Sequence, residues 1–301
     1  MEPTISLKAT GRSARRLRAN RTAELVAVTA ALIAVGALVI LVGSVLVKAL
    51  PAINMDFFTK GPAVFGESGG GIAPAFVGTA MLVAIATAMA VPFGVLLAIF
   101  VSEFASRRFA DQVRLWLDVL NGFPSIVVGI FVFALMVQKS IPIIGIGHHQ
   151  SAWAGGFALA VIMLPLIART TMEVLSLVPN SLREASYALG VSKWRTVLMV
   201  VLPTATSGIV TGTTLAVARA AGETAPLLFA CSIFGQVVET DPSVSVASVP
   251  VIIFEYSESP DTNLNAQAWA AAFVLIMFVL VTSLVSRILL DRSRRKLGAA
   301  A

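Results

Sequence analysis

The sequence predicts an all-α integral membrane protein with six transmembrane helices. Hydrophobic residues make up 57% of its 301 residues and charged residues only 13%, whereas soluble domains carry about 25% charged residues. The mean hydropathy is +0.89. The charged residues cluster between long uncharged runs, a pattern typical of helices that cross a bilayer one after another.

The net charge of +6 does not indicate a nucleic-acid-binding protein, because the basic residues flank apolar runs instead of forming one basic face. The single cysteine, Cys231, excludes an internal disulfide and a multi-cysteine zinc site. We expect it to be a small buried apolar residue.

The first predicted span, residues 25–47, follows a basic tail, residues 1–24. Its uncharged run is 23 residues long. A signal peptide has an apolar region of only about 7 to 15 residues, whereas a spanning helix needs about 20. We therefore expect this span to remain part of the protein. The basic residues of the tail are Lys8, Arg12, Arg15, Arg16, Arg18 and Arg21.

The remaining spans fall in a core from residue 69 to 290. The second span is predicted at 75–101, with a kink at Pro92, and a polar connection at 102–118 follows it. The third span, 119–138, opens with Gly122 and Pro124. The fourth, 151–168, is closed by Arg169.

The fifth span is predicted at about 203–225, and its end is ambiguous. It either ends at Ala218 or carries Arg219 inside the bilayer. An acidic loop at 239–262 separates it from the sixth span, 266–286, and a basic tail at 287–301 ends the chain.

The positive-inside rule predicts the orientation of the six spans. The two tails and the connections 102–118 and 169–195 hold eighteen of the 22 Lys and Arg residues, whereas the loops on the other side hold only Lys48, Lys60 and Lys139. Both termini are therefore predicted to be cytoplasmic, and the acidic loop is predicted to face outward.

The cytoplasmic connection 169–199 contains signals for a short surface helix. Ser181 and Glu184 have capping-box spacing, and Gly190 is a typical helix stop. Ser192 is expected to cap a second helix that runs into the fifth span. One face of the first helix is predicted to consist of Leu182, Ala185, Ser186 and Leu189.

The fifth span has the most unusual composition. Small residues recur every four positions, which lets a neighbouring helix approach closely. They are Gly208, Gly212, Ala216 and Ala220.

Arg219 and Glu223, one helical turn apart, lie on the adjacent stripe of the fifth span. An arginine inside the bilayer costs at least about 2.5 to 3.5 kcal/mol, so it needs a partner. Two interpretations stay open. Either the two side chains only neutralise each other, or the guanidinium of Arg219 binds an oxyanion such as phosphate in a cavity.

Enzymatic activity has little support in the sequence. It has no G-x-x-x-x-G-K-[ST] loop to hold ATP, and no catalytic Ser, His and Asp set is placed plausibly. His148 and His149 lie in a Gly- and Pro-rich loop without nearby Cys or carboxylates, so we expect a solvated loop and not a metal site. No cofactor is expected.

The segment after Arg183 resembles the cytoplasmic EAA loop of ABC importer permeases. It has Glu184, Ala185, Ser186 and Gly190, followed by Leu202–Pro203, with serine in place of the second alanine. Three stretches are similar to the phosphate-specific branch of that family, the PstA-type permeases. They are PSIVVG from Pro124, REASYALG from Arg183 and ARAAGETAPLL from Ala218.

The resemblance implies a type I ABC importer permease fold that imports inorganic phosphate. It implies four kinds of partner: a homologous PstC-like permease, two copies of a cytoplasmic PstB-like ATPase, an extracytoplasmic PstS-like phosphate-binding protein and the membrane lipid. Arg219 and Glu223 would lie on the translocation path. The loop that couples to the ATPase would include Leu182, Arg183, Glu184, Ala185, Leu189 and Gly190.

Several alternatives remain at this stage. The substrate can be another oxyanion, such as sulfate or molybdate, or the chain can be an ion-coupled carrier or a membrane receptor. The face Leu182, Ala185 and Leu189 can lie in a groove of an ATPase or on lipid headgroups.

Overall fold

The computed structural model describes residues 11–63, 66, 69–138, 149–231, 235 and 237–298, and this part of the chain is helical with no strand. Two units are distinguished, residues 1–48 and 49–301. The first unit consists of most of helix α1 (Arg12–Ala49), which contains the predicted first span and begins inside the basic tail. At about 1.5 Å per residue its 38 residues extend about 57 Å, enough to cross a bilayer.

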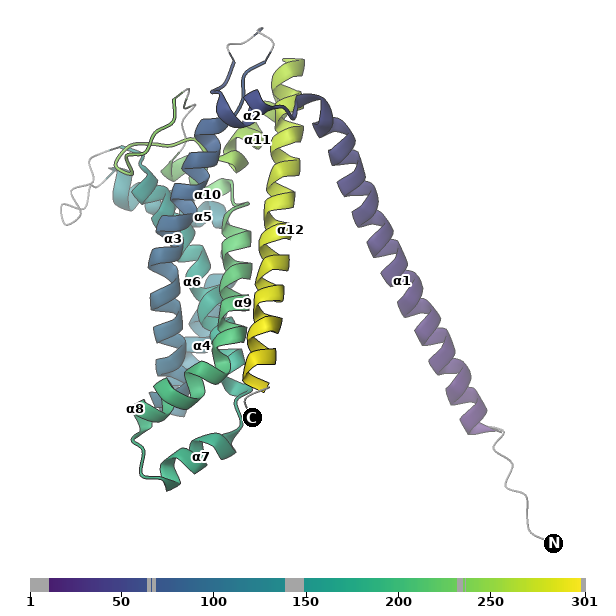
Figure 1. Cartoon of the computed structure of the whole chain (residues 1–301), viewed down its shortest axis with the longest axis vertical. Coiled ribbons are helices and arrows are strands. Elements are labelled where there is room, and N and C mark those ends of the chain that lie inside the picture. The colour runs from purple at the N-terminus through teal and green to yellow at the C-terminus, as the bar shows by residue number, and fades with distance from the viewer. Residues whose placement is uncertain are drawn as a thin grey trace. The chain divides into compact units, whose positions relative to one another are not determined.

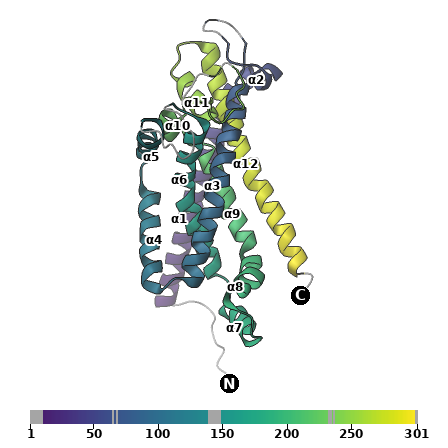
Figure 2. The same ribbon diagram turned by 90° about the vertical axis from the view of Figure 1, so that its left-hand side faces the viewer.

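The second unit is a bundle in which α3, α6, α9 and α12 run side by side (Figures 1 and 2). Helix α3 (Ala73–Ile99) ends in a π-helical turn, Phe100–Phe104, and packs along α6 (Ala152–Ser176). Glycines allow the close approach: a Cβ on Gly156 would lie 2.5 Å from Ile85, and one on Gly94 would lie 3.0 Å from Ile167. Large apolar side chains fill the rest of the core, among them Leu82, Leu159 and Met163.

The predicted third span is not one helix. Helix α4 (Arg107–Gly122) already begins within the stretch expected to be a polar connection, and α5 (Ser125–Val132) follows it, continued by a π-helical turn, Phe133–Gln138. The two arms are bent by 95°. The break lies at Phe123–Pro124, because proline lacks an N–H and forces the preceding residue into extended backbone.

The predicted fourth and fifth spans also have different ends. Helix α6 continues two turns beyond Arg169, whose guanidinium pairs with Glu173 at 3.1 Å and Asp118 at 3.6 Å on the surface. The chain re-enters the bundle at α8 (Lys193–Thr196) and passes through a π-helical turn, Val197–Val201, into α9 (Leu202–Ala220). The fifth span is therefore one continuous helix that begins earlier than expected and ends before Glu223.

The short helix α7 (Asn180–Ala188) lies at one end of the bundle with α8 (Figure 1). The predicted cap at Ser181 is wrong, because the helix begins at Asn180, after Pro179, and no side chain caps it. Ser192 does precede α8, but its side chain makes no capping bond. Gly190 ends this segment as predicted, with φ of 76° in the left-handed region that favours glycine.

The opposite end of the bundle carries α2 (Met55–Thr59), α10 (Ala225–Ala230) and α11 (Val249–Ser257) (Figure 1). Helix α11 lies within the stretch expected to be an acidic loop. Helix α12 (Thr262–Gly298) then runs back along the bundle. Within the described residues, five helices are long and apolar enough to cross a membrane, or six if the bent pair α4 and α5 is one span.

Candidate functional site

Two of the sequence motifs meet where α5 contacts α10. A Cβ on Gly129 would lie 2.6 Å from the Cα of Pro226 and 3.3 Å from the carbonyl oxygen of Ala225. Only a residue without a side chain fits there without moving one of the two backbones. The stretch from Pro124 and the stretch from Ala218 therefore form one structural unit, although about ninety residues separate them.

Arg219 lies in the last turn of α9, beside this junction. Its Nε donates to Oε1 of Glu223 at 3.4 Å, the only hydrogen bond that Arg219 makes within the described residues. The Arg219 side chain is 49% exposed and that of Glu223 is 16% exposed. Because the bond is long and half-exposed, it holds the guanidinium weakly, and both Nη groups keep their donors for another acceptor.

The side chain of Arg219 lines a small hollow at the bend between α4 and α5. The hollow has a volume of about 20 Å³, enough for about one water molecule. A guanidinium can bind an oxyanion through two parallel hydrogen bonds, and Arg219 is the one charged residue among those that line this hollow. The other lining residues are Leu120, Asn121, Phe123, Ser125, Val128, Val161 and Ile162.

The small-residue stripe of α9 faces α6. A Cβ on Gly208 would lie 2.5 Å from Val174, and one on Gly212 would overlap the side chain of Thr170. Ala216 and Ala220 lie in the main apolar core. The stripe therefore lets α9 lie directly against α6, and it fixes the helix that carries Arg219.

The two sides of α7 differ in exposure. Leu189 is 83% exposed and Leu182 is 40% exposed, and Glu184, Ala185 and Gly190 are exposed as well. Ser186, which was expected on the same face as the two leucines, is instead buried, with its hydroxyl 2.8 Å from that of Thr196. The exposed apolar face is therefore Leu182, Ala185 and Leu189.

Arg183 points into the protein, away from that exposed face. It forms a salt bridge of 2.8 Å with Glu103, and the two side chains are only 14% and 6% exposed. No local pattern in the sequence indicates this contact, because Glu103 lies eighty residues before Arg183.

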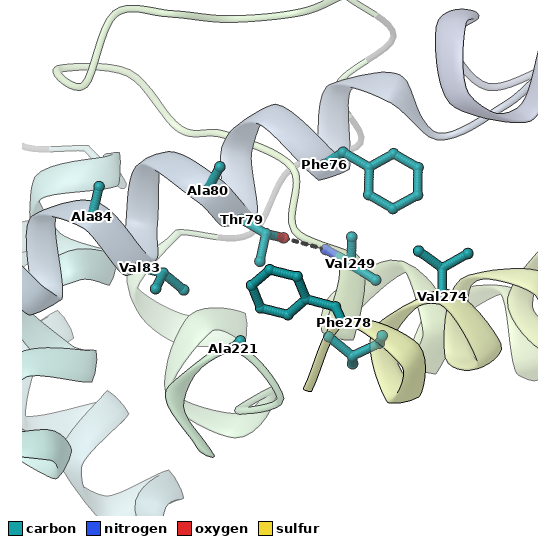
Figure 3. A pocket seen from close by; sticks show the side chains of 10 residues that line it. Phe76, Thr79, Ala80, Val83, Ala84, Ala221, Val249, Val274 and Phe278 are labelled. Carbon is teal, nitrogen blue, oxygen red and sulfur yellow. Dashed lines mark hydrogen bonds between the residues drawn. The ribbon is translucent and has the colours of Figure 1, made fainter. Parts of the chain in front are cut away.

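A pocket of about 440 Å³ lies between α3, the end of α9, α11 and α12 (Figure 3). Its one polar lining side chain, Thr79, already accepts a hydrogen bond of 2.8 Å from the backbone N–H of Val249. Figure 3 shows the rings of Phe76 and Phe278 among the apolar groups around it. The pocket offers an oxyanion no charged side chain, and its lining is otherwise apolar, so it is not a candidate anion site.

The other residues considered for chemistry show no site. Nε2 of His149 lies 3.0 Å from the carbonyl oxygen of Ser243, and His148 lies outside the described residues. Cys231 is a buried free cysteine. In the part of the chain that the structure describes, no group of three or more His, Cys, Asp or Glu residues is arranged to hold a metal ion.

Comparison with known proteins identifies the family. Residues 90–297 match the model of the binding-protein-dependent transport system inner membrane component. The phosphate transport system permease protein PstA of Haemophilus influenzae is 39% identical over 251 residues, which cover 83% of this chain and 86% of that protein. PstA of Yersinia pestis is 36% identical over 94% of both chains. PstA 1 of Mycobacterium tuberculosis is 38% identical over 75% of this chain and 72% of that protein.

Solved structures share the fold. A bacterial alginate ABC transporter in complex with an alginate pentasaccharide-bound periplasmic protein contains a chain that matches with a TM-score of 0.63 at 12% identity, over 95% of this chain and 98% of that chain. A chain of an inward-facing MetNI methionine ABC transporter matches with a TM-score of 0.55 at 19% identity, over 73% of this chain and 94% of that chain. At these identities the likeness concerns the fold alone.

These matches agree with the helical architecture and with the length and apolar character of its helices. The fold is that of type I ABC importer permeases, and the chain is a multi-pass protein of the cell membrane. The chain belongs to the family of binding-protein-dependent transport system inner membrane components, and within it to the PstA-type permeases.

Proposed function

We propose that this chain is the membrane-spanning permease subunit of an ATP-driven importer of inorganic phosphate. The observation that carries the proposal is the identity of 36% to 39%, over most of the chain, to permeases of phosphate transport systems. The sequence has no phosphate-cradling ATP loop, so ATP is hydrolysed by a separate subunit.

Arg219 is the residue that we propose on the translocation path. Its half-exposed guanidinium keeps both Nη groups available, and Glu223 holds it through Nε alone. The hollow beside it has room for about one water molecule, so a complete phosphate site requires groups from a second, homologous permease subunit. Phosphate is bound by Arg219 and then passes to the other side when the two permeases move.

The exposed face of α7 is the proposed contact with the ATPase. Leu182, Ala185 and Leu189 form a short apolar surface on an otherwise polar helix, which suits a helix-in-groove contact. The distribution of Lys and Arg supports a cytoplasmic position for this end of the bundle. A substrate-binding protein on the outer side would deliver phosphate.

The proposed mechanism is alternating access. ATP binding closes the ATPase pair and moves α7, and α8 and α9 continue from α7 without a long loop. The movement therefore reaches Arg219 along one helix, and the permease opens in turn to each side of the membrane.

The substrate is tested by uptake of radiolabelled phosphate into vesicles that contain the chain with its partner subunits. We expect uptake that requires ATP and that unlabelled phosphate suppresses. Stronger suppression by sulfate or molybdate than by phosphate would instead identify another oxyanion importer. Uptake that stops with an ionophore and resists vanadate would identify an ion-coupled carrier.

The ATPase contact is tested with two leucines of similar exposure. Leu189, in the proposed contact face, is 83% exposed, and Leu177, before α7, is 79% exposed. A carboxylate in the apolar contact would be desolvated, so Leu189→Asp should abolish co-purification of the ATPase. Leu177→Asp is the control and should leave co-purification unchanged. Equal behaviour of the two variants would contradict the assignment of this face.

A further inference from the structure

Arg183 connects α7 to two other parts of the bundle. Its Nη1 donates to the carbonyl oxygen of Val178 at 2.7 Å and to Oδ1 of Asn180 at 3.2 Å. Its Nη2 donates to Oε1 of Glu103 at 2.8 Å and to the carbonyl oxygen of Leu175 at 3.1 Å. The guanidinium therefore holds the end of α6, the start of α7 and the end of α3 together.

Glu103 belongs to the π-helical turn that ends α3. Its side chain is 6% exposed, so the carboxylate is almost fully removed from bulk solvent. The pair lies at the wall of a polar cavity of about 310 Å³ that Arg114 and Ser176 also line. A buried pair with additional hydrogen bonds resists separation far more than a surface pair does, because breaking it leaves an unpaired buried charge.

Within the described residues, α7 has one other side-chain hydrogen bond to a neighbouring helix, between the hydroxyls of Ser186 and Thr196. That bond leads through α8 into α9. The bond of Arg183 leads into α3, which packs along α6 over most of its length. Arg183 and Ser186 are three residues apart and lie on the same, inward face of α7. A displacement of α7 is thus passed on by this face, through Ser186 to α8 and through Arg183 to the end of α3 and the end of α6.

We propose that Arg183 and Glu103 are positioning residues that transmit the movement of α7 to α3. In this proposal, which rests on the proposed function, the ATPase moves α7, the guanidinium moves with it, and Glu103 moves the end of α3. Without the pair, α9 and the end of α6 still follow α7, but α3 does not. The bundle then opens incompletely although ATP is still hydrolysed.

The test compares Glu103→Gln and Arg183→Lys with the wild-type complex in vesicles, measuring phosphate transported per ATP hydrolysed. Lysine keeps the charge but has three donors on a single nitrogen, whereas the two Nη atoms of Arg183 donate to four acceptors. We expect both variants to retain ATP hydrolysis. The phosphate transported per ATP hydrolysed should fall at least about fivefold, which is the lower end of typical coupling between two sites. A merely structural role would lower both activities together and leave the ratio unchanged.

Arg114→Gln is the matched control. Arg114 lines the same cavity, but its salt bridge of 3.2 Å with Asp111 is exposed. We expect an unchanged ratio in this variant. A wild-type ratio in Glu103→Gln and Arg183→Lys would overturn the positioning role while leaving the proposed function intact. An absence of ATP-dependent uptake in the wild type would overturn the proposed function itself.

A distance measurement in the otherwise unchanged chain covers the case in which the variants do not assemble. Cys231 is buried, so spin labels react with cysteines introduced at Tyr187 on α7 and Leu96 on α3, which are 41% and 62% exposed. If α7 and α3 move as one body, the distance between the labels is the same with and without trapped nucleotide. A change of this distance between the two states would overturn the proposal.

Discussion

Replacing Gly129 with alanine tests whether the junction of α5 and α10 positions Arg219. The new Cβ would lie 2.6 Å from the Cα of Pro226, and ordinary van der Waals contact begins at 3.4 Å, so the two segments must separate by about 0.8 Å. Overpacking of this kind costs about 1 to 3 kcal/mol, and the better helix propensity of alanine offsets about 1 kcal/mol of it. The expected loss of stability is therefore no more than about 2 kcal/mol.

The expected effect on transport is larger. Ser125 and Val128, just before Gly129, line the hollow at Arg219, and Arg219 lies six residues before Ala225. A displacement near 1 Å in a binding site can reduce its rate by about a hundredfold, so we expect phosphate uptake to fall at least about tenfold. The assay is ATP-dependent uptake of radiolabelled phosphate, with thermal unfolding measured on the same preparation.

Gly122→Ala is the control, because a Cβ there has no neighbour within 4 Å. We expect it to leave uptake unchanged and to raise stability by up to about 1 kcal/mol, the difference in helix propensity. Wild-type uptake in Gly129→Ala, or an equal loss in both variants, would refute the role of the junction.

Three further predictions concern stability. Burial raises the pKa of Glu255, whose Oε2 is buried without a partner in the described part of the chain. The folded protein therefore loses stability as the pH rises from the ordinary pKa of 4.5 through the raised pKa. Glu255→Gln should raise the Tm more at pH 8 than at pH 5, and an equal effect at both pH values would contradict this. Backbone N–H groups of Gly66 and Asn263 lower the pKa of Asp261 below its ordinary value of 3.8, so its stabilisation is present above pH 3.8 and is lost as the pH falls through the lowered pKa. Asp261→Asn should therefore lower the Tm at pH 7, with a difference that shrinks below pH 3.8, and a pH-independent difference would oppose it. Gly190→Ala should lower the free energy of unfolding by about 1 to 2 kcal/mol, because alanine disfavours a φ of 76° although its Cβ would meet no neighbouring atom. An unchanged stability in thermal unfolding would contradict this prediction.

Much of the helical framework follows from the sequence, because apolar runs long enough to cross a bilayer are hard to mistake. The pairing of Arg219 with Glu223 also follows, since residues four apart on a helix are neighbours. The left-handed turn at Gly190 was predictable from residue type alone.

The bend at Pro124 was not predicted, although the sequence contains signals for it. The polar residues Arg107, Asp111, Arg114 and Asp118 are spaced by four, three and four, so they lie on one face of a helix. Counting charges assigned this stretch to a connection, whereas the phase of the charges indicates the amphipathic helix α4.

The salt bridge between Arg183 and Glu103 could not be predicted from local patterns. It joins segments eighty residues apart, and it depends on how α3 and α6 pack. The sequence placed Arg183 off the apolar face of α7 and the family resemblance included it in the coupling loop, but neither indicated that its guanidinium turns inward to Glu103.

The central claim is that Arg219 binds phosphate on the translocation path, and uptake by the Arg219→Gln complex tests it most directly. Glutamine removes the charge and the fork, whereas Arg108→Gln removes an exposed charge on α4 as a control. We predict that vesicles with Arg219→Gln contain the fully assembled complex and take up no phosphate above background, while Arg108→Gln behaves as the wild type. Full uptake by the Arg219→Gln complex would contradict the account.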